Sequence, residues 1–85
     1  MAVSNYTATT TSGTVSAANE TRQQLVITNI GTVNVFLNVG GAAIANMGYT
    51  LYPGGVWEMD RWIFTRDTVT AITASSTALL SIYEI

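Results

Sequence analysis

The chain has 85 residues, of which 9% are charged, and three cations against five anions give a net charge of −2. It contains no cysteine, no histidine and no lysine. These absences exclude Ser-His-Asp and Cys-His nucleophiles, the usual zinc sites and lysine Schiff bases. Three arginines on an acidic chain also argue against nucleic-acid binding, which depends on neutralising phosphates. The length suffices for one domain.

The surface of this chain must be covered largely by uncharged residues. Typical domains carry about 25% charged residues, so Thr, Ser, Asn, Ala and Gly take their place here. Either this is a solvated Thr/Asn-rich β surface, or much of it is buried against other subunits; a hydrophobic content of 48% favours the second explanation. The sequence predicts no membrane span and no signal peptide, and it indicates no cofactor, metal or small-molecule substrate.

The N-terminal segment, residues 1–18, is rich in threonine and is broken at Ser12-Gly13. It is either an edge strand or an extended arm. Residues 19–85 are expected to form a β-sandwich, so that the chain is one domain. Arg22, at the start of that region, is expected to cap a sheet edge or to pair with a carboxylate such as Glu20.

Two strands are predicted next, over residues 23–30 and 33–39. Leu25 and Ile27 share one face of the first strand. In the second, four aliphatic residues alternate with polar residues and Phe36, which is the period of a half-buried strand. The aliphatic face must meet the core, which leaves Phe36 among asparagines on the opposite face. We therefore expect Phe36 to contact another subunit.

Two short strands, over residues 49–52 and 56–60, flank the turn at Pro53-Gly54-Gly55. Trp57 and Met59 are predicted to point into the core. Glu58 and Asp60 share the other face, because side chains two apart on a strand point the same way. They could be calcium ligands or an acid pair, but a charged, solvent-facing strand edge is the preferred interpretation. The two glycine doublets open no helix, so they are expected to form turns and not phosphate sites.

The connection over residues 61–67 carries three large apolar residues, Trp62, Ile63 and Phe64. Either they plug the open end of the sandwich or they anchor a partner, since large aromatics dominate binding hot spots. A third interpretation is that the rings stack against a sugar. We expect Trp62, Ile63 and Phe64 to belong to the partner surface.

The C-terminal region is predicted to be a hairpin of strands 69–74 and 77–85 around Ser75-Ser76. Both faces of its last strand are apolar, with Ala78, Leu80 and Ile82 on one and Leu79, Tyr83 and Ile85 on the other. Only one face can meet the chain's own core. Leu79, Tyr83 and Ile85 are therefore predicted to contact a partner or a second copy.

The number and spacing of these strands predict the fold class. Seven or eight short strands separated by turn residues, with helix signals nearly absent, are typical of an all-β protein. We expect a small antiparallel β-sandwich or a jelly-roll-like barrel.

Several stretches of the chain resemble small structural proteins of tailed-bacteriophage virions. The resemblance covers about residues 19–84 and rests on the following segments: NETRQQLVITN at 19–29, NVFLNVGGAA at 34–43, LYPGGVWEMD at 51–60 and VTAITASSTALLSIYE at 69–84. It consists of strand and turn types more than of chemistry. Residues 1–18 lie outside it.

The resemblance implies a non-enzymatic protein on the capsid surface of a virion, made in the host cytoplasm. Such a decoration, or cement, protein binds the major capsid protein and forms homo-oligomers, with a trimer as the expected state. It would stabilise the shell by bridging neighbouring capsid subunits through several modest contacts at once. The alternatives are a phage tail or fibre module and a carbohydrate-binding β-sandwich module.

Overall fold

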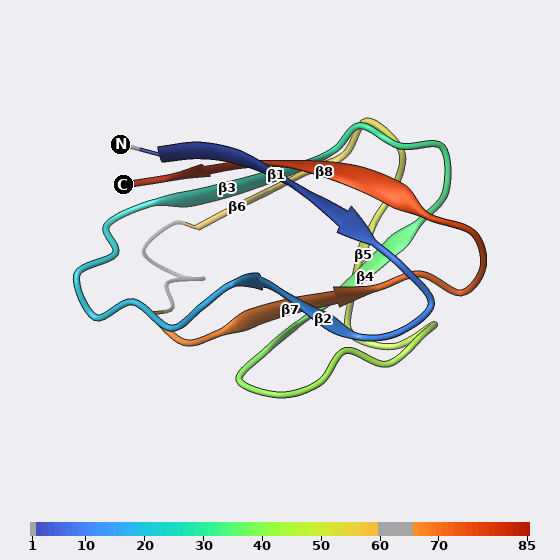
Figure 1. The fold of residues 1–85 in the computed structure, drawn as a ribbon, viewed down its shortest axis with the longest axis horizontal. Coiled ribbons are helices and arrows are strands. Elements are labelled where there is room, and N and C mark those ends of the chain that lie inside the picture. The colour runs from blue at the N-terminus through green and yellow to red at the C-terminus, as the bar shows by residue number, and fades with distance from the viewer. Residues whose placement is uncertain (1, 60–65) are drawn as a thin grey trace.

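The computed structural model describes residues 2–59 and 66–85, and these residues form eight β-strands and no helix. The strands are β1 (Ala2–Ala8), β2 (Gly13–Ser16), β3 (Leu25–Asn29), β4 (Val35–Val39), β5 (Tyr49–Leu51), β6 (Val56–Glu58), β7 (Val69–Ile72) and β8 (Ala78–Glu84). They build two four-stranded antiparallel sheets that face each other as a sandwich (Figure 1). The predicted all-β class is confirmed. Within these residues, nothing has the length and apolar character of a membrane-crossing helix.

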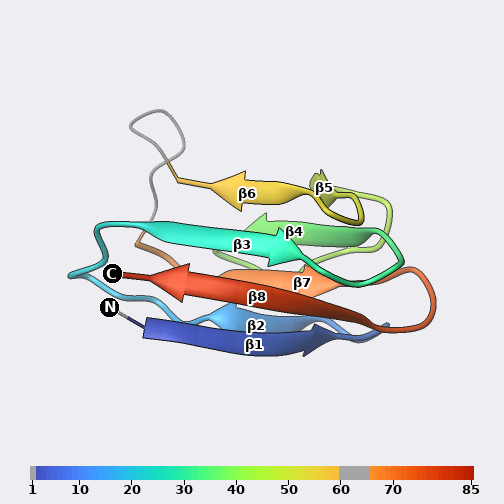
Figure 2. The same ribbon diagram turned by 90° about the horizontal axis from the view of Figure 1, so that it is seen from above.

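The connectivity is that of a jelly roll. Sheet A has the strand order β1-β8-β3-β6, and sheet B has the order β2-β7-β4-β5. The first strand thus pairs with the last, the second with the seventh, the third with the sixth and the fourth with the fifth. Such a chain is a long antiparallel ribbon that has rolled up into two sheets. The two terminal strands therefore lie side by side (Figure 2).

The N-terminal segment belongs to the sandwich and is not a separate arm. Its strands β1 and β2 are edge strands, one in each sheet. Ala8 is fully buried, and Tyr6 packs against the core. A Cβ atom at Gly13 would overlap the Tyr6 hydroxyl. The glycine in β2 therefore leaves the space that this tyrosine of β1 occupies.

The core lies between the two sheets and follows the alternation of the strands. Its buried members are Ala8, Leu25, Ile27, Val35, Leu37, Leu51, Trp57, Met59, Val69, Ala71, Ala78, Leu80 and Ile82. Trp57 and Met59 are 3% and 1% exposed, which confirms the prediction for both. The prediction for strand 33–39 holds only in its middle, because Val39 at the end of β4 is 42% exposed.

A buried asparagine joins the turns at one end of the sandwich. Asn29 is fully buried, and its amide nitrogen donates to the carbonyl oxygens of Val33 and Leu51 at 2.8 and 2.9 Å. Its side-chain oxygen accepts from the Gly31 backbone at 2.9 Å. Its own backbone exchanges hydrogen bonds with Gly54 and Gly55. One side chain thus satisfies backbone groups that burial would otherwise leave unpaired.

The predicted C-terminal hairpin is wrong. Strands β7 and β8 lie in different sheets, and the connection between them crosses from one sheet to the other. β7 pairs with β2 and β4, whereas β8 pairs with β1 and β3. Both strands turn apolar residues to the core from opposite sides, so placing them in one sheet would take a central strand away from the other sheet.

We predict that Trp57→Ala lowers the free energy of unfolding by about 3–5 kcal/mol, because it empties a large volume in the core. Tyr52→Ala is the matched control, since Tyr52 is 63% exposed and its loss should cost less than about 0.5 kcal/mol. Urea denaturation followed by fluorescence or circular dichroism measures both. Equal effects of the two substitutions would contradict the placement of Trp57.

Candidate functional site

The outer faces of the two sheets differ in how the chain covers them. The β4–β5 connection, residues 40–48, lies against the outer face of sheet B. The Thr70 hydroxyl donates to the Gly41 carbonyl at 2.7 Å, and the Asn38 amide donates to the Ala42 carbonyl at 2.9 Å. Ala43, within this connection, is only 5% exposed. Sheet B therefore has a cover made from its own chain.

The cover changes the position of one predicted partner residue. Phe36 does point away from the aliphatic residues of β4, as expected, but it is only 6% exposed. It shares a hollow with Asn46 of the 40–48 connection. The expectation of an exposed ring on this face was wrong, because periodicity shows which face a residue takes but not what folds over that face. In this conformation Phe36 offers a partner almost no surface.

Sheet A has an outer face that no described segment crosses (Figure 2). Strand alternation and the pairing register place the following side chains on it: Val3, Asn5 and Thr7 of β1; Leu79, Ser81 and Tyr83 of β8; Val26 and Thr28 of β3; Val56 and Glu58 of β6. We call this set the sheet A face. Glu58, in the edge strand β6, is its one charged member.

The apolar members of the sheet A face are well exposed. Val3 is 72% exposed, Val56 50% and Leu79 38%. Ile30 and Ile85, in the segments that follow β3 and β8, are 54% and 43% exposed. A face with one charged residue and several exposed aliphatic groups, lying on a regular sheet, is a surface of the kind that proteins use for association.

The structure thus divides the predicted partner residues into three groups. Leu79 and Tyr83 lie on the sheet A face, and Ile85 continues it beyond the end of β8. Phe36 is buried under the sheet B cover. Trp62, Ile63 and Phe64 lie outside the described residues, as do Asp60 and Arg61.

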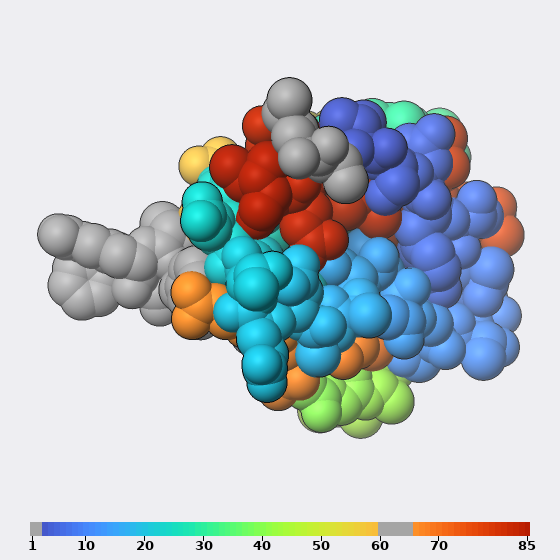
Figure 3. Space-filling view, turned by 60° about the vertical axis from the view of Figure 1, so that its left-hand side comes forward, coloured from blue at the N-terminus to red at the C-terminus, as the bar shows by residue number. Residues whose placement is uncertain are grey.

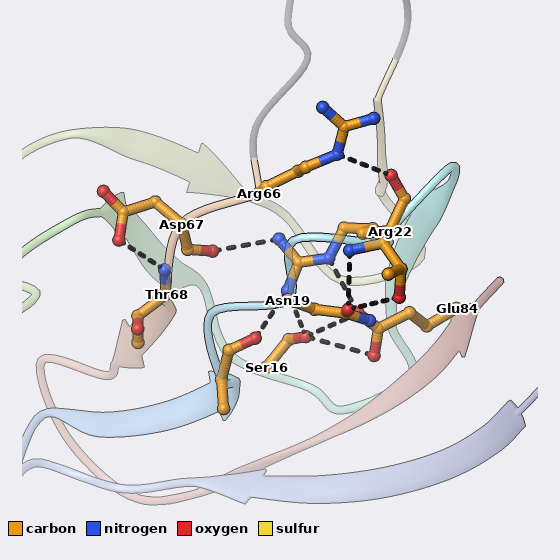
Figure 4. A network of polar contacts seen from close by, with 9 residues as sticks. Ser16, Asn19, Arg22, Arg66, Asp67, Thr68 and Glu84 are labelled. Carbon is orange, nitrogen blue, oxygen red and sulfur yellow. Dashed lines mark hydrogen bonds and ion pairs between the residues drawn. The ribbon is translucent and has the colours of Figure 1, made fainter.

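A buried arginine organises the opposite, inward side of the C-terminal strand. Arg22 is fully buried, and its Nε donates to Glu84 Oε2 at 2.7 Å. The expected pairing with a carboxylate is confirmed, but the carboxylate is Glu84 and not Glu20, which is exposed. Figure 4 shows Arg22 at the centre of contacts from four segments. Figure 3 shows the C-terminal residues, in red, against the cyan connection between β2 and β3.

Three further guanidinium hydrogens of Arg22 also meet acceptors. Nη2 donates to the Ser16 hydroxyl and to the Ala17 carbonyl, both at 2.7 Å. Nη1 donates to the Asp67 carbonyl at 2.9 Å. The arginine thus connects the end of β2, the segment before β7 and the end of β8. A buried charge is tolerated in a fold when it is both paired and hydrogen-bonded in this way.

The carboxylate of Glu84 is held in its charged form. Partial burial acts to raise the pKa of Glu84, but hydrogen bonds from Arg22, Asn19 and Ser16, with the arginine's charge, outweigh that effect. The net result is a pKa below the ordinary glutamate value. The alternation of β8 contains a signal for this role of Glu84. Ala78, Leu80 and Ile82 point inward, and Glu84 is the next residue on the same side of the strand.

An apolar hollow opens between the sheets beside Val69, the first residue of β7. It has a volume of about 240 Å³ and is lined by Leu37, Asn38, Val39, Gly48, Tyr49, Trp57 and Val69. The rings of Tyr49 and Trp57 meet edge to face, with centroids 6.4 Å apart. Val39 lines this hollow, which accounts for its exposure although it lies on the inward face of β4.

Metal-binding and acid–base chemistry find little support in the residues that the structure describes. In residues 2–59 and 66–85 no three His, Cys, Asp or Glu side chains gather as metal ligands. Glu58 stands alone on the sheet A face, and its predicted companion Asp60 is outside the described residues. What the described residues do present is an exposed, largely apolar sheet face and a buried polar network around Arg22.

Comparison of the chain with protein-family models, with characterised proteins and with solved structures found no match. The virion resemblance therefore stays an expectation from the sequence.

We predict that the stability of the fold depends on the ionisation of Glu84. Because its pKa is lower in the folded chain than in the unfolded chain, this contribution is complete above the ordinary value of 4.5. It is lost as the pH falls through the lower folded-state pKa. The free energy of unfolding should thus decrease as the pH falls below that ordinary value, measured by urea denaturation at a series of pH values.

Glu84→Gln tests the same contact at neutral pH. It should cost about 2–3 kcal/mol, less than a fully buried pair, because the Glu84 side chain is 24% exposed. It should also flatten the acid dependence. Glu20→Gln makes the same chemical change at an exposed position and should cost less than about 0.5 kcal/mol. A Glu84→Gln protein with unchanged stability and acid dependence would contradict the assignment.

Proposed function

We propose that this chain is a non-enzymatic structural protein of a bacteriophage virion, which decorates the capsid and stabilises it by bridging capsid subunits. It acts as a homo-oligomer, and the resemblance to virion proteins points to a trimer. The major capsid protein is its main partner. The sheet A face is the docking surface in this proposal.

The observation that carries the proposal is the contrast between the two sheets. Sheet B is covered by residues 40–48, whereas the sheet A face is left open and carries a single charge at its edge. In a free monomer, the exposed Val3, Val56 and Leu79 would be a liability for solubility. Burial against a shell or a second subunit removes that liability.

The shape of the fold suits attachment to a lattice. A sandwich held at one end by Arg22 and Glu84 presents the sheet A face as a rigid platform, so little ordering entropy is lost when it docks. Each platform makes contacts of modest strength. An oligomer that engages several capsid subunits at once multiplies them through effective concentration.

The carbohydrate-binding alternative has one observation in its favour. A hollow of about 300 Å³ is lined by Phe36, Val33, Asn34, Asn46, Ala74 and Ser75. The amide and hydroxyl groups of Asn34, Asn46 and Ser75 in this lining can hydrogen-bond a sugar, although Phe36 is too buried to stack against one. Binding on a glycan array would support this alternative over capsid docking. A tail or fibre location is the other alternative, and imaging of intact particles distinguishes it.

We predict that Leu79→Asp abolishes attachment to capsids, because it places a carboxylate in the middle of the docking surface. Purified protein is mixed with capsids of the encoding phage that lack it, and binding is measured by co-sedimentation. The apparent Kd should rise at least tenfold. A melting curve checks that the variant is folded.

Ile44→Asp is the matched control. Ile44 is 56% exposed but lies in the 40–48 connection over sheet B, so attachment should be unchanged. Loss of binding in both variants, or in neither, would contradict docking through the sheet A face.

A further inference from the structure

The four sheet edges of the sandwich are not equally protected against pairing with another chain. Proteins block exposed edges with short strands, bulges or charged side chains. β5 and β6 have three residues each, and β6 also carries Glu58. β2 has four residues and a register shift between Thr14 and Ser16. Three of the edges therefore carry a protective feature.

The fourth edge, β1, carries none of these features. It runs for seven residues, with the sequence AVSNYTA, and contains no charge and no proline. Its pairing with β8 is regular from Ala2 to Ala8. Among the described strands, β8 is its one neighbour, so its other side is free. Val3, Ser4, Asn5 and Thr7 are all exposed.

We infer that β1 pairs antiparallel with β1 of a second copy of this chain, about a two-fold axis at Asn5. The two A sheets then form one continuous eight-stranded sheet. In this register Asn5 faces Asn5 of the other copy, and Val3 faces Thr7. The inference rests on the homo-oligomer in the proposed function. A two-fold contact cannot lie within a trimer, so the β1 contact forms either a dimer in place of the trimer or a link between two trimers.

A second copy fits this edge better than an unrelated strand for two reasons. An uncharged edge can approach the same edge of a second copy without like-charge repulsion. In an antiparallel pair about a two-fold axis, the backbone donors and acceptors of β1 also face those of the identical strand. The area is also sufficient. Seven residues give an edge about 24 Å long, and the side of a two-layer sandwich is about 20 Å deep. The pair would bury roughly 1,000 Å², where specific association begins.

The first test measures the mass of the free protein, without capsids, by light scattering behind size exclusion. A two-fold contact closes at two copies, so we expect at least about 18 kDa, twice the 9.1 kDa chain. Asn5→Lys should halve the measured mass, because two lysines would face each other across the axis. Val56→Lys is the matched control and should leave the mass unchanged, because Val56 is 50% exposed and lies in β6, at the opposite edge of sheet A.

The second test uses the absence of cysteine from the chain. Residues that face each other across an antiparallel pair have Cα atoms about 4.5–5.5 Å apart, within the range of a disulfide. Asn5→Cys should therefore form a covalent dimer under mild oxidation, seen on a non-reducing gel. Val56→Cys, at the opposite edge of sheet A, should stay monomeric on the same gel.

The outcomes separate this contact from capsid docking. A monomeric protein, a mass that Asn5→Lys leaves unchanged, or no cross-link at Asn5 would overturn the β1 pairing. If Asn5→Lys abolishes capsid binding while the free mass is unchanged, a capsid strand and not a second copy occupies the edge. Conversely, Leu79→Asp should lose capsids but keep the dimer, so failure of one proposal does not imply failure of the other.

Discussion

The buried positive charge of Arg22 constrains how the rest of this fold is arranged. Arg22 comes early in the chain and Glu84 comes at its end, and the charge of the first is stable inside only if the second reaches it. Glu84 stands opposite Ala2 on one side and Leu25 on the other. A slip of β8 by one residue would turn its carboxylate outward and expose Leu80 and Ile82. The ion pair therefore selects one register for the three strands β1, β8 and β3. An apolar pair of the same volume could be as stable, but it would not specify the register in this way.

The use of charge inside the sandwich bears on the composition of its surface. The chain has eight charged residues, and Arg22 and Glu84 are used in the interior contact. The few that remain are too sparse to keep both outer faces polar. One face is covered by residues 40–48 through hydrogen bonds from Thr70 and Asn38. The other consists of Thr, Ser, Asn and aliphatic residues. The low charge content of the chain thus explains why the open sheet A face has only one charged side chain.

The sequence predicts what is local in this structure and misses what joins distant segments. Alternation places Leu25, Ile27, Trp57 and Leu80 in the core, since a strand's period of two depends on neighbours alone. The partner of Arg22 is 62 residues away, whereas the sequence by itself suggests Glu20, which is only two residues away. The supposed hairpin of β7 and β8 failed for the same reason. Two apolar strands joined by a short connection can pair in one sheet or lie in two different sheets. Which arrangement forms depends on the strands that pair with β7, namely β2 and β4, and these are distant in sequence.

The rolled ribbon also explains why the free edge of sheet A is the longest one. In a jelly roll the outermost pair, β1 with β8, has seven residues in each strand, whereas the inner strands β5 and β6 have three each. β8 gains a second neighbour, β3, when the ribbon rolls up. β1 is at the outside of the roll and gains none among the described strands. The longest unpaired stretch of backbone therefore arises from the topology itself, beside the face that carries the exposed Val3 and Leu79. Assembly through this side of the molecule would use the edge and the face together, while the end held by Arg22 stays unchanged.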